Sequence, residues 1–380
     1  MAKKLAVLLL VIVASFAAGA RGDQIGEPAV SANARLAGPQ RHSSSQVPDL
    51  EALGLFLDDL MLEHEIPGFG FALFDDEGLL YEHVGGLKSR TDGEPIDRNT
   101  AFEAASISKP VFAYVAHSLM REGRLALGAP LDTLVEEVPE LAYDPRVSAL
   151  TPEILLSHRG GLPNWRSRLR FAAQDYSELF APDDRLEFIA DPATGYHYSG
   201  EGYVLLQRVV QEMTGEGLNE LAKARVFDPL AMARSSFLFD AETRENYALG
   251  HDRDGNPDKW EIYLPLASST LHTTAADLAR FGSHLASQIR TGGPYAALAA
   301  PAVLVAEADG KTLHWGQGLG LVTDASRRYV YHGGNNVIFI ADLMYGIEEN
   351  LGYVLLTNSS NGQAAVDAVE QRIFGRRVRR

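Results

Sequence analysis

The chain of 380 residues contains no cysteine. Disulfides, thiolate nucleophiles and cysteine-ligated zinc or iron–sulfur centres are therefore excluded. Positive charge is also scarce, because 34 lysines and arginines stand against 50 aspartates and glutamates, for a net charge of -16. Nucleic acids and anionic lipid surfaces need a basic face, so this balance argues against either as the main partner.

Several catalytic signatures are missing as well. The sequence has no H-E-x-x-H, no G-x-x-x-x-G-K-[ST] and no G-x-S-x-G. Their absence argues against a zinc peptidase, a P-loop nucleotide site and an α/β-hydrolase nucleophile elbow. The histidines are scattered without ligand spacing, so we expect neither a metal nor a cofactor.

The N-terminus has the pattern of a secretory signal peptide over residues 1–20. Two lysines precede an apolar run at 5–18, and a small-x-small cleavage site follows before Arg21. The run is short for a bilayer span, although a short N-terminal anchor stays an alternative. Residues 21–47 lack periodicity and are expected to form a flexible linker. The mature protein is therefore expected to be periplasmic or secreted, without stable membrane insertion after signal cleavage.

Hydrophobic patterning predicts strands at both ends of the mature chain. An amphipathic helix at 49–65 precedes two strand-like runs, and a helix is expected at 364–374. The expected strands are 69–74, 79–84, 313–322, 328–331, 337–344 and 352–357. Between about 125 and 262 the pattern is one of short helices and long loops. We therefore expect an α/β (α+β) fold, with an antiparallel sheet built from both termini, flanking helices and a mostly helical middle region.

One catalytic unit is expected over 48–375. Its sheet region comprises 48–105 and 265–375, and its helical region is 106–264. The remaining residues, 376–380, form a basic tail that is expected to be frayed.

The most informative stretch is Ser106-Ile107-Ser108-Lys109-Pro110, which contains an S-x-x-K motif. Of the seven lysines, only Lys109 has a serine three residues before it. On a helix this spacing puts both side chains on one face. The apolar surroundings predict a lowered pKa for Lys109, which lets its amine take the Ser106 proton. A helix start with a chance lysine is the alternative for the motif alone.

Two further stretches carry candidate chemistry. Tyr198 lies in a glycine-rich aromatic loop and can relay protons if nearby positive charge lowers its pKa. His332, Gly333 and Gly334 end a strand-like run, where glycines allow a close approach of the backbone to substrate. Free N–H groups there would stabilise an oxyanion. Taken alone, Tyr198 could be a structural aromatic and His332 a strand-end histidine bonded to backbone.

The order of these three stretches resembles the serine hydrolases that share the class C β-lactamase and D-alanyl-D-alanine carboxypeptidase fold, a group that includes esterases and D-aminopeptidases. The segments 155–163, 229–232 and 273–281 also match sequence motifs that are usual in this group. The resemblance implies Ser106 as the acylated nucleophile and Lys109 with Tyr198 as the proton-transfer pair. It places His332 where many members carry lysine. The N–H groups of Ser106 and Asn335 would form the oxyanion hole.

Two departures from the family pattern bear on the substrate. Gly200 stands where the tyrosine motif commonly has asparagine, and His332-Gly333-Gly334 stands where the lactamases have Lys-Thr-Gly. Histidine is only partly cationic at neutral pH, so a substrate carboxylate would be held less firmly. We expect a serine hydrolase that cleaves an ester or amide of a small molecule or short peptide. A D-amino-acid peptidase, a β-lactamase of the same fold and a non-catalytic peptide-binding homologue are the alternatives. Specificity is expected in the loops at about 160–190 and 235–265.

Overall fold

The computed structural model describes residues 47–136, 141, 143–167, 169–170, 173–181, 183–258 and 263–379. The predicted signal peptide and all of the predicted linker except Val47 lie outside the described residues. Within the part of the chain that is described, no helix is both long enough and apolar enough to cross a bilayer.

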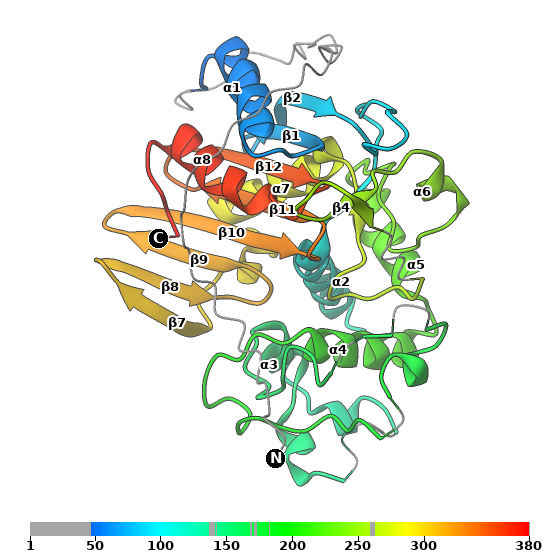
Figure 1. Ribbon diagram of the computed structural model, residues 1–380. Coiled ribbons are helices and arrows are strands. Elements are labelled where there is room, and N and C mark those ends of the chain that lie inside the picture. Colours follow the sequence, from blue (N-terminus) through cyan, green and yellow to red (C-terminus); the bar gives the residue numbers. More distant parts are fainter. Residues whose placement is uncertain are drawn as a thin grey trace, which may run out of the picture. The chain divides into compact units, whose positions relative to one another are not determined.

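The central element is an eight-stranded sheet in which every neighbouring pair is antiparallel (Figure 1). Its first two strands come from the N-terminal part of the chain and the other six from the C-terminal part, which confirms the predicted fold class. In spatial order the strands are β2 (Leu79–Gly86), β1 (Gly68–Phe74), β12 (Leu351–Thr357), β11 (Ile340–Gly346), β10 (Arg327–Asn335), β9 (Gly320–Asp324), β8 (Lys311–Trp315) and β7 (Val303–Ala308).

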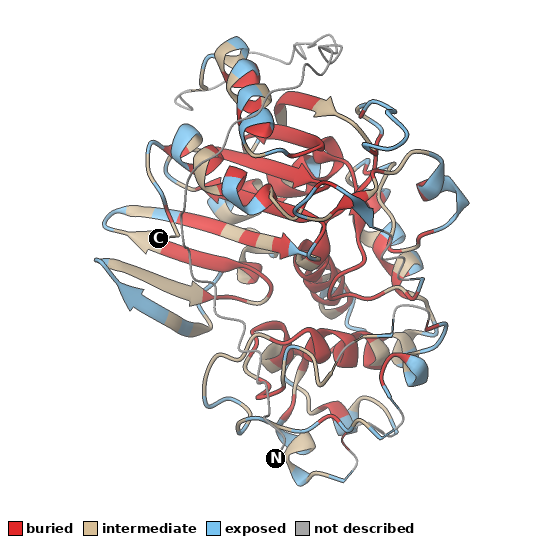
Figure 2. Ribbon diagram, viewed as in Figure 1, coloured by how far each residue is buried: buried red, intermediate tan, exposed pale blue. Residues whose placement is uncertain are grey.

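The middle of this sheet is covered on both faces. Every residue of β1, β11 and β12 is buried, whereas most of the edge strand β7 is exposed (Figure 2). Along β12, Val354 and Leu356 enter one apolar core, while Tyr353 and Leu355 enter the other. This alternation follows from the two-residue period of a strand. Strands buried on both faces read as continuous apolar runs, which is why the sequence identified them.

Helices α1 and α8 pack against one core, and α2 and α7 against the other. Asp49 caps α1, accepting from the N–H groups of Glu51 and Ala52, and Thr274 caps α7. The α-helices are α1 (Leu50–Glu63), α2 (Ser108–Arg121), α3 (Pro152–Leu156), α4 (Gly200–Thr214), α5 (Leu218–Ala222), α6 (Ala241–Glu245), α7 (Ala275–Thr291) and α8 (Gly362–Phe374). Two small sheets pair β3 (Phe102–Glu103) with β6 (His272–Thr273) and β4 (Gly250–His251) with β5 (Pro257–Asp258).

The predicted strand at 313–322 is wrong in its continuity. The segment forms parts of β8 and β9, joined by a turn in which the Gly316 N–H donates to the Leu319 carbonyl at 2.8 Å. Gly318 has a φ of +128°, a conformation that glycine adopts readily. The two strands and the turn between them form one continuous apolar run that is rich in glycine. The sequence pattern therefore resembled a single strand.

The expectation of a frayed basic tail is also wrong. Val378 is fully buried, and the Arg379 guanidinium bonds Asp342 at 2.7 and 2.9 Å and Glu370 at 2.9 Å. Both carboxylates are buried, so the arginine compensates charge that would otherwise be unpaired inside the fold. Asp342 pairs in register with Gly333 on β10, so the tail supports the strand that ends at the predicted site.

Replacing this arginine should therefore reduce stability strongly. Arg379→Ala leaves two buried carboxylates without their cationic partner, and we expect a loss of roughly 3–5 kcal/mol in the free energy of unfolding. Arg377→Ala is the matched control, because its ion pair is 3.9 Å long and exposed; it should change stability by less than about 1 kcal/mol. Urea unfolding of both variants measures the difference, and equal stabilities would contradict the anchoring role.

Candidate active site

Ser106 and Lys109 lie next to each other at the junction of two helices. Ser106 belongs to the 3-10 helix η1 (Ala105–Ile107), and Lys109 is the second residue of α2. The Lys109 Nζ lies 3.1 Å from the Ser106 Oγ and donates to the Ser268 carbonyl at 2.8 Å. Lys109 is only 1% exposed, and burial lowers its pKa to about 7. The expected proximity and the expected lowered pKa are both present.

The backbone around Ser106 is held in an unusual conformation. Ala105 has a φ of +48°, a left-handed conformation that costs a non-glycine residue free energy. A methyl group at Gly334 would lie 2.4 Å from the Ala104 carbonyl oxygen, so β10 touches the chain just before the serine. Only glycine permits this approach. Gly334 therefore fixes the distance between the end of β10 and Ser106.

Tyr198 lies on the loop before α4, with its ring centre 4.8 Å from the Lys109 Nζ. Its phenol is hydrogen-bonded with Ser106. The condition of a pKa lowered by positive charge is not met, because burial raises the pKa of Tyr198 and the bond with Ser106 offsets only part of that effect. Tyr198 is consequently a neutral phenol at physiological pH and has a proton to give.

His332 is also neutral. The side chain is 1% exposed, and burial next to Lys109 lowers its pKa to about 3. Its Nδ1 lies 2.8 Å from the Gly333 carbonyl, which can only accept, so Nδ1 carries the proton. Its Nε2 is therefore an unprotonated acceptor. The expectation of a partly cationic histidine is wrong, because the sequence could not show how deeply His332 is buried.

The remaining predicted site residues, Gly333 and Asn335, have different surroundings at the end of β10. Gly333 faces the tail, and a methyl group added there would have Asp342 and Arg379 as its nearest neighbours. Asn335 ends the strand, and its Oδ1 accepts from the Val337 N–H at 2.7 Å. The structure thus brings Ser106, Lys109, Tyr198, His332 and Gly334 together. Gly333 instead faces the C-terminal tail.

A buried carboxylate that the sequence did not single out connects two parts of this site. Glu103 accepts from the Asn336 Nδ2 at 2.7 Å and from the Tyr247 hydroxyl at 2.9 Å. Asn336 also donates to the Ser269 carbonyl, the neighbour of the carbonyl that holds Lys109. Burial raises the pKa of Glu103 to about 7. This bridge fixes the end of β10 relative to Ser268.

A second missed group forms an aromatic wall beside Tyr198. The ring centre of Trp315 lies 5.4 Å from that of His158, 5.3 Å from that of His332 and 5.9 Å from that of Tyr198. His158 holds the tyrosine loop, since its Nδ1 accepts from the Ser199 N–H at 3.0 Å. The segment 155–163, which matches a motif of the family, could have indicated His158. No feature of the sequence indicated Trp315.

Comparison with known proteins agrees with this geometry. The family model described as Beta-lactamase matches residues 53–375. The chain belongs to the β-lactamase family. Its members adopt the fold seen here, and the chain is accordingly a serine hydrolase of the β-lactamase-related group.

Three relatives illustrate the range of this β-lactamase family. The chain is 29% identical over 271 residues to penicillin-binding protein 4 of Amycolatopsis lactamdurans, covering 65% of this chain and 67% of that protein. It is 29% identical over 222 residues to the esterase EstB of Burkholderia gladioli, covering 54% and 55%. The octameric penicillin-binding protein homologue of Pyrococcus abyssi superposes with a TM-score of 0.71 at 22% identity, covering 86% of this chain and 78% of that one.

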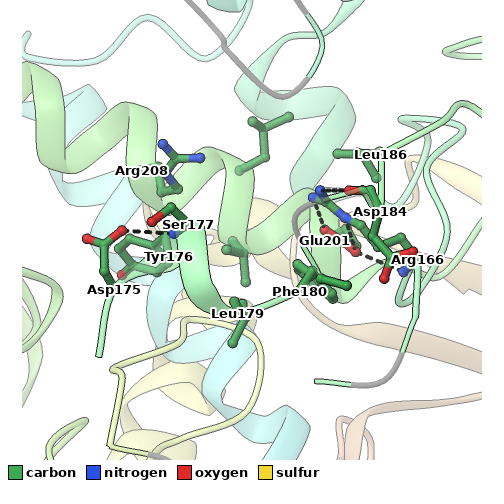
Figure 3. A pocket seen from close by; sticks show the side chains of 13 residues that line it. Arg166, Asp175, Tyr176, Ser177, Leu179, Phe180, Asp184, Leu186, Glu201 and Arg208 are labelled. Carbon is green, nitrogen blue, oxygen red and sulfur yellow. Dashed lines mark hydrogen bonds and ion pairs between the residues drawn. The ribbon is translucent and has the colours of Figure 1, made fainter. Parts of the chain in front are cut away.

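This family member has a cavity of about 360 Å³ (Figure 3). It is lined by residues of α4 and of the segment 166–186, and none of the predicted site residues lines it. Phe180 and the ion pair of Arg166 with Glu201 form part of its wall. Among the described residues, no group of three histidine, aspartate or glutamate side chains is arranged to hold a metal ion.

The contact at Gly334 leads to a paired prediction. Gly334→Ala would force β10 and η1 apart, and labelling of Ser106 by a fluorophosphonate should become roughly a hundredfold slower, as expected when reacting groups are misplaced by about 1 Å. In Gly333→Ala the new methyl group would have its nearest neighbours at 3.8 and 3.9 Å, which is ordinary contact. That control should label at close to the wild-type rate. Similar rates for the two variants would contradict the contact.

The lowered pKa of Lys109 predicts a pH dependence. Only the neutral amine accepts the Ser106 proton, so labelling by an uncharged fluorophosphonate should rise with pH and level off above about 7. Lys109→Arg should label far more slowly and lose this inflection, because arginine stays charged. Glu103→Gln is the control for the other group that titrates near 7 and should retain the inflection. A flat wild-type profile between about pH 6 and about pH 8 would exclude Lys109 as the base.

Proposed function

We propose that this protein is an exported serine hydrolase that cleaves an ester or amide of a small molecule or short peptide through an acyl-enzyme on Ser106. The carrying observation is the buried Lys109 amine, 3.1 Å from the Ser106 Oγ with a pKa of about 7. A neutral amine at this distance can take the hydroxyl proton at physiological pH. The Ser268 carbonyl holds one N–H of that amine, which leaves its lone pair for the serine.

Because the pKa of Tyr198 is raised, Tyr198 serves as the proton donor in the relay, and Lys109 serves as the proton acceptor. Lys109 takes the Ser106 proton as the hydroxyl attacks the substrate carbonyl, and the oxyanion is held by the N–H groups of Ser106 and Asn335. Tyr198 then gives its proton to the leaving group and is reprotonated from Lys109. Water attacks the acyl-enzyme by the same relay in reverse, returning the proton to Ser106.

The electrostatics of the site favour an uncharged substrate. His332 presents a neutral imidazole in the position where many relatives carry lysine, and Lys109 is only partly charged at neutral pH. A carboxylate on the substrate would thus meet little fixed positive charge. β-Lactams and D-alanyl peptides carry such a carboxylate, whereas simple esters and amides do not.

Export is proposed from the signal-like residues 1–20. The protein would act in the periplasm or outside the cell. N-terminal sequencing of the exported protein tests this, since cleavage in the predicted place leaves Arg21 first.

Substitution of the nucleophile is the central test. Ser106→Ala should abolish fluorophosphonate labelling and lower ester hydrolysis by at least about a thousandfold. Ser118→Ala is the control on α2, because its hydroxyl bonds only the exposed Glu122 side chain. That variant should behave like the wild type. Normal labelling of Ser106→Ala would refute the nucleophile.

A substrate panel separates the alternatives. Short nitrophenyl esters should be turned over faster than a penicillin or a peptide ending in D-alanine. The reverse order would favour the lactamase or D-peptidase alternative. Tight peptide binding without any acyl adduct would indicate a non-catalytic homologue.

A further inference from the structure

Gly200 and Tyr198 point to the same side of the loop before α4. Ser199 between them is extended, with φ -139° and ψ 114°, so its neighbours project opposite to its own side chain. The Ser199 hydroxyl turns into the fold, where it donates to the Pro163 carbonyl and accepts from the Gly202 N–H. A side chain at position 200 would therefore project to the side that carries the Tyr198 phenol and Ser106.

That space is occupied by Trp165. A methyl group at Gly200 would lie 2.7 Å from Cζ2 of the Trp165 indole and 3.0 Å from two further ring atoms. The glycine and the tryptophan are thus complementary, because the ring fills the volume that a side chain at 200 would take. The indole consequently borders the space next to Tyr198.

The backbone on both sides of Trp165 is tied to the first turn of α4. The Asn164 carbonyl accepts from the N–H groups of Gly200 and Glu201, each at 3.1 Å, which satisfies donors that a helix start leaves free. Arg166 bonds the Glu201 carboxylate at 2.9 and 2.7 Å, and its own N–H donates there at 2.8 Å. Glu201 is buried, so this ion pair is shielded from solvent. The backbone that carries the indole is therefore held in place on both sides of Trp165.

The indole packs against residues that line the 360 Å³ cavity, although Trp165 itself is not one of the lining residues. The ring centre of Trp165 lies 6.4 Å from that of Phe180, which lines the cavity (Figure 3). Leu179 and Val204, which also line it, belong to the apolar cluster against which Trp165 packs. Trp165 thus contacts both Gly200 and the apolar part of a cavity whose other lining residues are mostly polar or charged, among them Arg166, Glu201 and Arg208.

We infer that Trp165 is a specificity-determining residue that ends the acyl pocket of Ser106, so that the enzyme takes uncharged esters of short acyl chains. The inference rests on the proposed acylation of Ser106. A chain longer than the pocket meets the indole and is excluded from the cavity behind it. Removing the indole joins the two spaces and admits a longer chain.

The test compares nitrophenyl acetate, butyrate and octanoate. The wild type should prefer acetate and butyrate. Trp165→Ala should raise the ratio of kcat/KM for octanoate over acetate by at least about tenfold, the low end of what one methylene contributes in an enzyme pocket. Trp165→Leu keeps apolar packing in case the alanine variant does not fold, and should shift the ratio in the same direction. An unchanged ratio in a folded variant overturns the inference.

Leu169→Ala is the matched control, because Leu169 packs on the same apolar cluster but does not contact Gly200. A merely structural role would lower kcat/KM for all three esters together in both variants, and that outcome also overturns the inference. Calorimetric binding of the acetate and octanoate esters to Ser106→Ala, with and without Trp165→Leu, requires no acylation. A gain in octanoate binding there supports the pocket assignment even if labelling shows that Ser106 is not the nucleophile.

Discussion

The site depends on keeping one lysine out of water. Burial disfavours the charged form of Lys109, and the single carbonyl of Ser268 offers the amine a partner without a compensating negative charge. Had a carboxylate contacted the amine, the pKa would have been held high and the amine would not serve as a base. The same desolvation keeps His332 neutral and Tyr198 protonated. One buried environment therefore sets the protonation state of three groups.

That environment is maintained by strained backbone conformations and by buried side-chain bonds. Left-handed conformations occur at Ala105 before Ser106, at His158 behind the tyrosine loop and at Val337 after the end of β10. Each costs free energy and persists only because its surroundings fix it. Glu103 fixes β10 to the Ser268 segment, and Arg379 fixes it from the opposite face. These three positions lie on segments that carry or contact site residues.

The sequence predicted what depends on local patterning. The S-x-x-K spacing, Pro110 near the helix start and the continuous apolar strands all follow from short-range rules. The protonation states of the site residues could not be predicted from the sequence. They depend on how many distant segments cover a side chain, as for His332. The ion pair of Arg379 was missed for the same reason, since its buried partner Asp342 lies on a different element. Trp315 reaches Tyr198 only through the sheet, which no sequence spacing encodes.

Gly200 shows how one departure from a family pattern acquires a physical meaning. In the sequence, Gly200 was notable because it lacks the amide of the asparagine that is common at this position. That absence indicated only which substrate group the site does not bind. In the structure the missing side chain of Gly200 is matched by an indole whose backbone is held on both flanks. A cavity filled by a rigid aromatic excludes substrate groups as firmly as a polar side chain selects them, because core packing tolerates little displacement. Gly200 and Trp165 should therefore act as one unit, and any side chain introduced at position 200 requires the indole to move first.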